Sequence, residues 1–397
     1  MKEPEGLNEP LLDLQDTFTT WCETELFSSE IREATALQNR YCDLHLEGLY
    51  SRLGLVEHLS EFRSASELCG ALNFVETADI AMDSMLLRLG SRSDLIKTTH
   101  VDGETKFRAT AEAPDRKEEL RHTKNALFSL GEGFDASAEF IDFGAQNFEV
   151  ALRDDPELMD RLLSGRERQF RELWFRATNV DPLQNIHGIM GARAFAELFR
   201  GGSVLEIGGG TGNGIRNVLR ELRTQDSLSL IESYSFTDIS LEFILQTRHE
   251  VLRQHPALRA KWHHLDINKS LEDQKQAADS LDCIYGVNAA HVARDIVEFL
   301  VQCRQALRPG GCVIFAERVR VNPTEMAPRE LTLNGSIYHR TATTRAHYRP
   351  MHCYMAPENW LTVLKIAGFK NAVIFPDLEK LGLGFPDQYA AVIHGSI

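Results

Sequence analysis

The spacing of apolar residues divides the chain into a helical first part and a second part in which short strands alternate with helices. Between residues 12 and 90, leucine and methionine recur every three or four positions, which predicts amphipathic helices. Ser64 and Glu67 have the spacing of a capping box, so we expect a helix to begin there. Two short extended runs on either side of Asp102-Gly103 predict a β-hairpin after these helices.

Several helices followed by a hairpin indicate a winged-helix-like N-terminal domain over residues 1–115. The protein carries a formal net charge of −15, so we interpret this fold as an interaction or dimerisation module rather than a DNA reader. We expect it to mediate self-association, as in a homodimer, or to frame a substrate cleft. Residues 116–200 are also mainly helical and are expected to form a lid or linker region.

From residue 201 to 397 the pattern changes to that of an α/β domain. Short apolar runs separated by helical stretches predict a parallel sheet with right-handed crossovers. The expected strands span residues 203–207, 234–239, 261–267, 281–287 and 311–317, with a closing pair at 371–375 and 389–394. The predicted fold class is therefore α/β, a Rossmann-like sheet preceded by a mainly helical domain.

The composition excludes several classes of function. Of the 397 residues, 43% are hydrophobic and 25% are charged, as in globular proteins that bury a core. The acidic charge argues against a general nucleic-acid binder, and the sequence contains neither a secretory signal nor an apolar segment long enough to span a membrane. The seven cysteines show no paired spacing, which predicts free thiols in a reducing cytoplasm and no disulfide framework or metal site.

A glycine-rich turn follows the first expected strand of the sheet and opens a helix. It reads Glu206-x-Gly208-x-Gly210-x-Gly212, and its glycines allow the backbone to pass close under a ligand. Many nucleotide-binding folds share such a turn, so the motif alone has low specificity. Glu206 argues against a dinucleotide, because its carboxylate would repel a pyrophosphate. The same carboxylate suits the amino-acid end or the sulfonium charge of S-adenosylmethionine.

Two further acids are in register with successive strands. Asp238 ends the second strand, where its carboxylate can accept both hydroxyls of a ribose. Asp266 ends the third strand, where it can receive an adenine amino group. Ligands of open α/β sheets bind beyond the carboxyl ends of the strands, so we expect these acids, with Ile267 and Asn288, to form one cofactor site.

These motifs carry a resemblance to a known family. The run Val204–Gly212, together with the two acids and Leu307–Gly311, resembles a class I S-adenosylmethionine-dependent methyltransferase over roughly residues 185 to 397. The phrases at 234–240 and 288–295 are similar to those of the C-methyltransferase domains of polyketide synthases. The winged-helix pattern of the first part is instead similar to dimeric small-molecule O-methyltransferases.

His291 and Glu317 are the candidate catalytic pair. His291 follows the fourth strand and Glu317 ends the fifth, its neighbour in such a fold, so both side chains are expected to point into the cleft. A histidine oriented by a carboxylate can act as a general base on an activated methylene, a phenol or an alcohol. The resemblance implies that this histidine and glutamate form the catalytic dyad.

Weaker candidates for substrate contact are His187, in the helix before the glycine turn, and Tyr338 and Arg340, in a long connection rich in arginine and histidine. The arginines of residues 318–349 oppose the charge of the whole chain. They suit a phosphopantetheine arm, an acidic carrier protein or coenzyme A, or they belong to a solvated loop and pair elsewhere on the surface. No spacing around the histidines there supports a metal site.

The predicted function is that of a C-methyltransferase of specialised metabolism, using S-adenosylmethionine. Its predicted acceptor is the activated α-carbon of a polyketide-like β-keto thioester, offered as a small molecule or bound to a carrier protein. Two alternatives remain at this point. One is an O-methyltransferase acting on a phenolic or hydroxylated metabolite, and the other is a non-catalytic assembly module that retains the fold.

Overall fold

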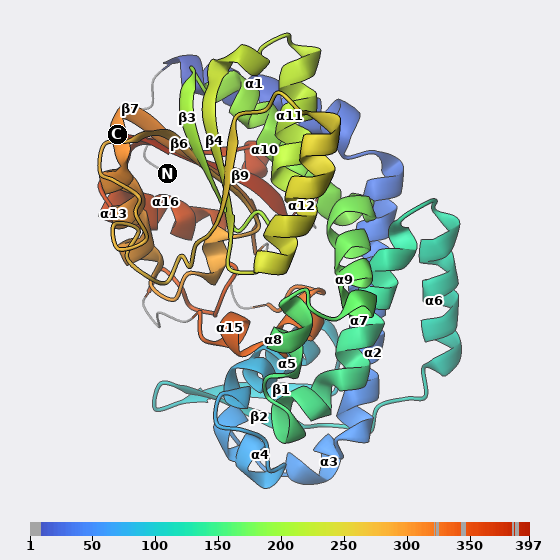
Figure 1. The fold of residues 1–397 in the computed structure, drawn as a ribbon. Helices are drawn as coiled ribbons and strands as arrows, with labels where there is room; N and C mark the ends of the chain where they lie inside the picture. The colour runs from blue at the N-terminus through green and yellow to red at the C-terminus, as the bar shows by residue number, and fades with distance from the viewer. Residues whose placement is uncertain (1–8, 321, 323–324, 343–346, 383–384, 386–388) are drawn as a thin grey trace.

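The structure is a computed structural model that describes residues 9–397 except 321, 323–324, 343–346, 383–384 and 386–388. It consists of a sheet flanked by helices and a mainly helical part beside it (Figure 1). The segment around the short helix α15 (Ile337–Arg340) lies between these two parts.

A seven-stranded sheet forms the α/β part, with the strand order β5-β4-β3-β6-β7-β9-β8. Its strands are β3 (Gly202–Ile207), β4 (Ile231–Asp238), β5 (Ala260–His264), β6 (Leu281–Val287), β7 (Leu307–Arg318), β8 (Lys370–Phe375) and β9 (Ala390–Ser396). The strands β3 to β7 pair in parallel, whereas β9 is antiparallel to β7 and to β8. The predicted α/β class and the predicted closing pair of strands are therefore confirmed.

The third predicted strand is shorter than its sequence indicates. It ends at His264, so Asp266 and Ile267 lie in the connection that follows and not in the strand. The cause is local, because the amide of Asp266 donates to the Oε1 atom of Gln274 (2.8 Å) and leaves the strand ladder.

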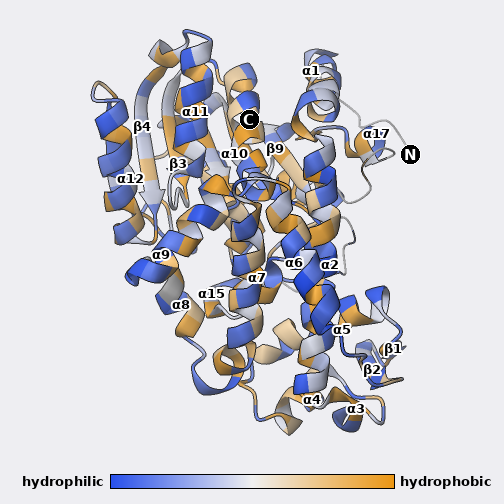
Figure 2. Cartoon of the chain, turned by 90° about the vertical axis from the view of Figure 1, so that its right-hand side faces the viewer, coloured by the Kyte–Doolittle hydropathy of each residue, from blue (hydrophilic) through white to orange (hydrophobic). Residues whose placement is uncertain are grey.

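Helices cover both faces of the sheet, which explains why its central strands are nearly continuous apolar runs. Along β3, Val204 packs toward one cluster and Leu205 toward the other, as the two-residue period of a strand requires. The first face is covered by α10 (Pro182–Leu198), α11 (Asn213–Thr224) and α12 (Leu241–Gln254), and the second by α13 (Ile296–Ala306) and α16 (Pro357–Ile366). Figure 2 shows the alternation of hydrophilic and hydrophobic residues along α11 that lets it bury one side.

The N-terminal part has the predicted helices and hairpin. Its elements are α2 (Ser29–Arg52), α3 (Leu55–His58), α4 (Ala65–Ala71), α5 (Ala78–Arg92), β1 (Ile96–Val101) and β2 (Glu104–Ala109). Ser64 and Glu67 form the expected capping box at the start of α4. An antiparallel bridge joins Arg63 to Phe107 of β2, so the connection between α3 and α4 contacts the hairpin.

The first described helix, α1 (Glu9–Trp21), packs on the far edge of the sheet and not in the N-terminal part. The Nε2 atom of Gln15 donates to the carbonyl of Ile374 (2.6 Å), and the rings of Phe18 and Phe375 lie 5.5 Å apart. Residues 116–200 form α6 (Lys117–Ser129), α7 (Phe134–Glu149), α8 (Leu158–Leu163), α9 (Arg168–Phe175) and α10. The last of these helices lies directly on the sheet, so the chain passes between the two parts more than once.

Three further short α-helices are α14 (Glu330–Leu333), α15 and α17 (Leu378–Gly382). None of the helices in the described ranges is long and apolar enough to cross a membrane. All seven cysteines are buried and free.

Candidate functional site

A cavity of about 410 Å³ lies beyond the carboxyl ends of β3 and β6, where the strand order reverses. This is the position at which open α/β sheets bind their ligands. The glycine turn forms one wall, the connection after β6 a second, and residues 329–339 with Tyr354 a third. The apolar side chains of its lining are Leu163, Trp174, Ile239, Val287, Val292 and Leu333.

The glycine turn comes close to the cavity because its residues lack side chains. Gly208 and Gly210 line the cavity and have φ angles of +53° and +52°, which glycine adopts without strain. A Cβ atom on Gly208 would lie 2.6 Å from that of Ala289, so no larger residue fits there. Gly212, with a φ angle of +83°, precedes the first residue of α11 and does not line the cavity.

Glu206 lies beneath this turn and not at the cavity wall, which differs from the expected contact with the cofactor. It projects from the face of β3 that α11 covers, and its Oε2 atom accepts a hydrogen bond from the hydroxyl of Tyr234 (2.9 Å). A Cβ atom on Gly214 would lie 2.2 Å from its Oε1 atom, so the carboxyl is packed against the start of α11. Burial raises the pKa of Glu206 to about 8. We conclude that Glu206 supports the turn from below.

Asp238 joins the end of β4 to the glycine turn. Its Oδ2 atom accepts from the amide of Gly210 (2.8 Å) and its Oδ1 atom from the amide of Ser240 (2.7 Å). Each oxygen can accept one more hydrogen bond, although burial raises the pKa of this carboxyl. Ile239 and Ser240, which follow it, line the cavity.

Asp266 and Ile267 lie outside the lining of the cavity. The Oδ1 atom of Asp266 accepts from the amide of Asn268 (3.0 Å), and Ile267 is buried in the apolar cluster under α13. Asn268 connects this turn to the cavity, because its Nδ2 atom donates to the hydroxyl of Tyr338 (2.8 Å). Among the described residues, Tyr338 lines the cavity, whereas Asp266 and Ile267 do not.

Asn288 lies at the wall, directly after β6. Its φ angle is +50°, and its Oδ1 atom accepts from the amide of Arg318 (2.7 Å), which fixes the side chain. The connection after β6 is thereby tied to β7, the next strand of the sheet.

His291 and Glu317 meet as the sequence predicts. His291 lies in the single turn Ala290–Val292, Glu317 lies near the end of β7, and both are buried. The Nδ1 atom of His291 is 2.5 Å from the Oε2 atom of Glu317. The other oxygen of Glu317 accepts from the amides of Ala289 (3.1 Å) and Ala290 (2.8 Å). His291 lines the cavity, and Glu317 lies behind it.

The other two substrate candidates do not reach the cavity. His187 is buried in α10 against the ring of Tyr389, and burial with nearby Arg318 lowers its pKa well below the usual value. Arg340 is turned away, and its guanidinium donates to the carbonyl of Asn334 (2.7 Å).

The arginines of residues 318–349 differ from both interpretations of the sequence, because the five described ones are buried inside the protein. Arg320 forms a double hydrogen bond with Glu330 (2.6 and 2.7 Å), and Arg349 donates to the carbonyl of Ala293 (2.7 Å). Arg329 alone of the five described lines the cavity, with Asp181 at 3.4 Å. Arg345 lies outside the described residues.

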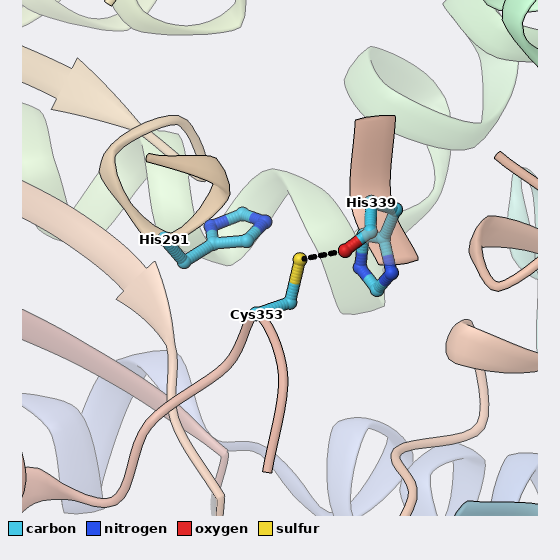
Figure 3. A group of neighbouring side chains, drawn as sticks. All are labelled: His291, His339 and Cys353. Carbon is cyan, nitrogen blue, oxygen red and sulfur yellow. Dashed lines mark hydrogen bonds between the residues drawn. The ribbon is translucent and has the colours of Figure 1, made fainter. Parts of the chain in front are cut away.

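Three other lining residues, His339, Tyr354 and Trp174, are not among the site residues that the sequence predicts. Tyr354 stacks on His291 with ring centroids 4.4 Å apart, and the ring of His339 lies 6.4 Å from that of His291. Only contacts between distant segments place these residues in the cavity, so no local pattern could have identified them. Figure 3 shows His291, His339 and Cys353 together.

Comparison with known proteins identifies the fold. Residues 205–313 match the family model described as a methyltransferase domain. The chain carries a methyltransferase domain. This part of the chain includes the glycine turn, Asp238 and His291.

Solved structures show the same overall fold. The CurJ carbon methyltransferase superposes on 95% of this chain and 96% of its own length, with a TM-score of 0.73 and 18% identity. The trans-methyltransferase CalH, in complex with SAH, covers 95% of this chain and 94% of its own, with a TM-score of 0.58 and 17% identity. The fold is therefore that of a class I, S-adenosylmethionine-dependent methyltransferase.

Curated relatives of the methyltransferase domain are polyketide synthases. The highly reducing polyketide synthase PKS2 of Leptosphaeria maculans is 30% identical over 212 residues. The match includes 53% of this chain but 8% of that protein, so the chain spans less than a tenth of its length.

The cavity suits S-adenosylmethionine in this fold. The glycine turn leaves room for a ligand at Gly208 and Gly210, and the Asp238 carboxylate beside it retains acceptor capacity. When bound, the cofactor supplies an electrophilic methyl group. The described residues that would hold it are the turn, Asp238 and its neighbours Ile239 and Ser240.

Proposed function

We propose that this protein is a C-methyltransferase of specialised metabolism that methylates the α-carbon of a polyketide-like β-keto thioester. The observation that carries the proposal is the His291–Glu317 pair, in which His291 lies at the wall of the cavity. An α-carbon between two carbonyl groups must lose a proton before it can accept a methyl group, and this pair is suited to take it.

The contacts of Glu317 support the role of His291 as a general base. Because Nδ1 of His291 bonds to the carboxylate, the proton of a neutral ring lies on Nδ1 and Nε2 is free to accept. The two amides on the other oxygen of Glu317 hold the carboxylate in one orientation. When His291 takes a proton from the α-carbon, the adjacent charge of Glu317 stabilises the imidazolium that forms.

The lining of the cavity supports an acceptor with an apolar chain. Leu163, Trp174, Val292 and Leu333 supply apolar surface, which exceeds the polar surface of the lining. Such a lining keeps water away from the carbanion and orients the acyl chain. A carrier-bound thioester is the form of substrate that we propose, because the relatives are polyketide synthases.

O-methylation of a phenolic or hydroxylated metabolite is the alternative, since the same base could deprotonate a hydroxyl group. Carbon is preferred here because CurJ, which superposes on nearly the whole chain, is a carbon methyltransferase. The non-catalytic alternative is disfavoured by the buried acid–base pair, which an assembly module would not need.

We further propose three units: residues 1–115, 116–200 and 201–397, as the sequence divides them. The first would frame the substrate cleft or mediate self-association. In support of the first role, Arg88 of α5 donates to the carbonyl of Met326 (2.7 Å), beside the segment that lines the cavity.

The test of this function is the position of the transferred methyl group. The full chain is incubated with methyl-¹³C-labelled S-adenosylmethionine and either a β-keto thioester or a phenol, and the products are analysed by NMR and mass spectrometry. We expect label on the α-carbon of the thioester. Label on oxygen, or on the phenol only, would establish the alternative.

A further inference from the structure

His339, on the short helix α15, has a polar ring that the protein leaves without a partner. The residue is 4% exposed and lines the cavity, and neither ring nitrogen has a hydrogen-bond partner among the described residues. A buried polar group without a partner costs free energy, and natural proteins retain one where it has a use. Figure 3 shows the His339 ring near His291, with Cys353 between their segments.

The rings of His339 and His291 are held at a fixed separation. Tyr354 packs against both, with ring centroids 5.8 Å from His339 and 4.4 Å from His291. A ring nitrogen of His339 and one of His291 lie within 4.8 Å of each other. The Nδ1 atom of His291 bonds to Glu317, so Nε2 is its acceptor nitrogen, and the free ring of His339 lies 6.4 Å away between ring centroids.

We propose that His339 donates a hydrogen bond to the carbonyl oxygen of the acceptor while His291 removes the proton from the carbon next to it. This inference rests on the proposed function and specifies its substrate: a compound with a C–H group adjacent to a C=O group. In such a compound the carbon and the oxygen are about 2.4 Å apart, from the C–C and C=O bond lengths. The ring centroids of His339 and His291 are 6.4 Å apart, so one ligand of this size can contact both rings.

The proton and the electron pair are accounted for in this step. The C–H bond breaks, and its proton passes to the Nε2 atom of His291. The electron pair stays on the acceptor and spreads from the carbon to the carbonyl oxygen. The N–H group of His339 stabilises the charge that develops on that oxygen, and it acts where water is excluded.

The surroundings of His339 keep it a neutral donor. Burial lowers its pKa well below the usual value, and His352, His291, Arg320 and Arg349 lower it further. A neutral imidazole carries one N–H and gives it up far less readily than an imidazolium. At neutral pH, His339 would therefore polarise the carbonyl group of the acceptor and would not itself take up a second proton.

A metal ion is the competing explanation for this cluster. His291, His339 and Cys353 could hold one, as could Glu330, His339 and His352. The sulfur of Cys353 donates to the carbonyl of His339 (3.2 Å), and burial raises the pKa of this thiol well above its usual value. Glu330 is occupied by Arg320 and by the amide of Ala327. These contacts favour a hydrogen-bonding site, and metal content enters the test.

The experiment measures proton removal without methyl transfer. The full chain, without S-adenosylmethionine, is incubated in D₂O with the acetoacetyl thioester of N-acetylcysteamine, and deuterium uptake at the α-carbon above the uncatalysed rate is followed by mass spectrometry. His339→Leu should slow the catalysed exchange about 10²- to 10³-fold, the loss typical of one oxyanion donor. His339→Gln retains a side-chain N–H and should retain part of the rate. The affinity for S-adenosylmethionine should be the same in all variants.

His394→Gln is the matched control, because His394 is a buried histidine of β9 that does not line the cavity. It should exchange at the wild-type rate. A folded His339→Leu variant with wild-type exchange overturns the inference, as does a stoichiometric metal ion that is lost in Cys353→Ser. If His339→Leu does not fold, ¹⁵N NMR of the wild-type protein decides: binding of the thioester should shift a ring nitrogen of His339, and no shift overturns the inference.

The outcomes separate this inference from the proposed function. If His291→Ala loses exchange but His339→Leu does not, the donor role fails and the base remains. If neither variant loses exchange and label appears on oxygen, the proposed function itself fails.

Discussion

The Nδ1 atom of His291 lies 2.5 Å from the Oε2 atom of Glu317, and the same carboxylate accepts the amides of Ala289 and Ala290 through its other oxygen. One side chain thus fixes both the ring of His291 and the backbone turn that carries it. The orientation of the proposed base is therefore set by β7, the neighbouring strand, and not by the turn alone.

Glu317→Gln should reduce turnover by forcing the wrong tautomer of His291. The amide oxygen of the glutamine must take the place facing the two backbone amides, so its NH₂ group must face Nδ1. His291 would then carry its proton on Nε2, toward the cavity, and could not accept another. An analogous change in serine proteases costs about 10⁴-fold, so we expect a loss of that order. Steady-state kinetics measure the loss and ¹⁵N NMR the tautomer; wild-type turnover would contradict the geometry.

Asp238→Ala should weaken the binding of S-adenosylmethionine by roughly 2 kcal/mol, the scale for losing hydrogen bonds to a charged group. The control is Asp282→Ala. Asp282 also accepts a hydrogen bond from a backbone amide, that of Ser203 (2.7 Å), but it lies next to the start of β3 and away from the glycine turn. Calorimetry should show weaker binding in the first variant alone. Equal affinities in folded variants would remove Asp238 from the cofactor site.

Glu206 should make the free protein less stable as the pH rises. Its pKa is about 8 in the folded state against the usual 4.5, so the folded state binds the proton more tightly. The stability that this proton contributes is fully present below about pH 4.5 and is lost as the pH rises through about 8. In Glu206→Gln the side chain cannot ionise, so the free energy of unfolding should fall less steeply with pH than in the wild type. The two slopes should differ by up to about 1.4 kcal/mol per pH unit over this window.

Urea denaturation at several pH values measures this difference. The control is Glu232→Gln, which changes an exposed glutamate of β4 and should leave the profile as in the wild type. Parallel profiles for the wild type and Glu206→Gln would mean that Glu206 is already ionised in the folded protein.

Arg88→Ala should destabilise the protein by about 3–5 kcal/mol, because it leaves the largely buried Asp43 without its partner (2.7 Å). Activity should fall with it, since Arg88 also holds Met326 beside the segment that lines the cavity. The matched change is Arg92→Ala, which removes a half-exposed partner of Glu325 (2.6 Å) and should cost at most about 1 kcal/mol. Equal effects in thermal unfolding would show that the buried pair of Arg88 and Asp43 contributes no more to stability than the more exposed pair of Arg92 and Glu325.

The sequence predicts those features that depend on neighbouring residues. The capping box at Ser64, the hairpin and the alternation of strands and helices all arise from short-range patterns and are present in the structure. The meeting of His291 and Glu317 could also be predicted, because parallel neighbouring strands bring their carboxyl ends together.

Features that depend on distant contacts could not be predicted. Arg329 contacts Asp181, which is 148 positions away in the sequence. The burial of Arg329 could therefore not be deduced from the arginines around it. Glu206 belongs to the expected motif, but the direction of its carboxyl depends on Tyr234 and on the start of α11. His339 reaches the cavity only because α15 lies between the two parts of the fold.

The most direct test of the account is the turnover of His291→Ala with a β-keto thioester at neutral pH. A general base typically contributes about 10²- to 10⁴-fold, so turnover should fall by that factor. The affinity for S-adenosylmethionine should stay nearly unchanged, because the ring acts on the acceptor and not on the cofactor. A folded His291→Ala protein that methylates the thioester at the wild-type rate would contradict the account.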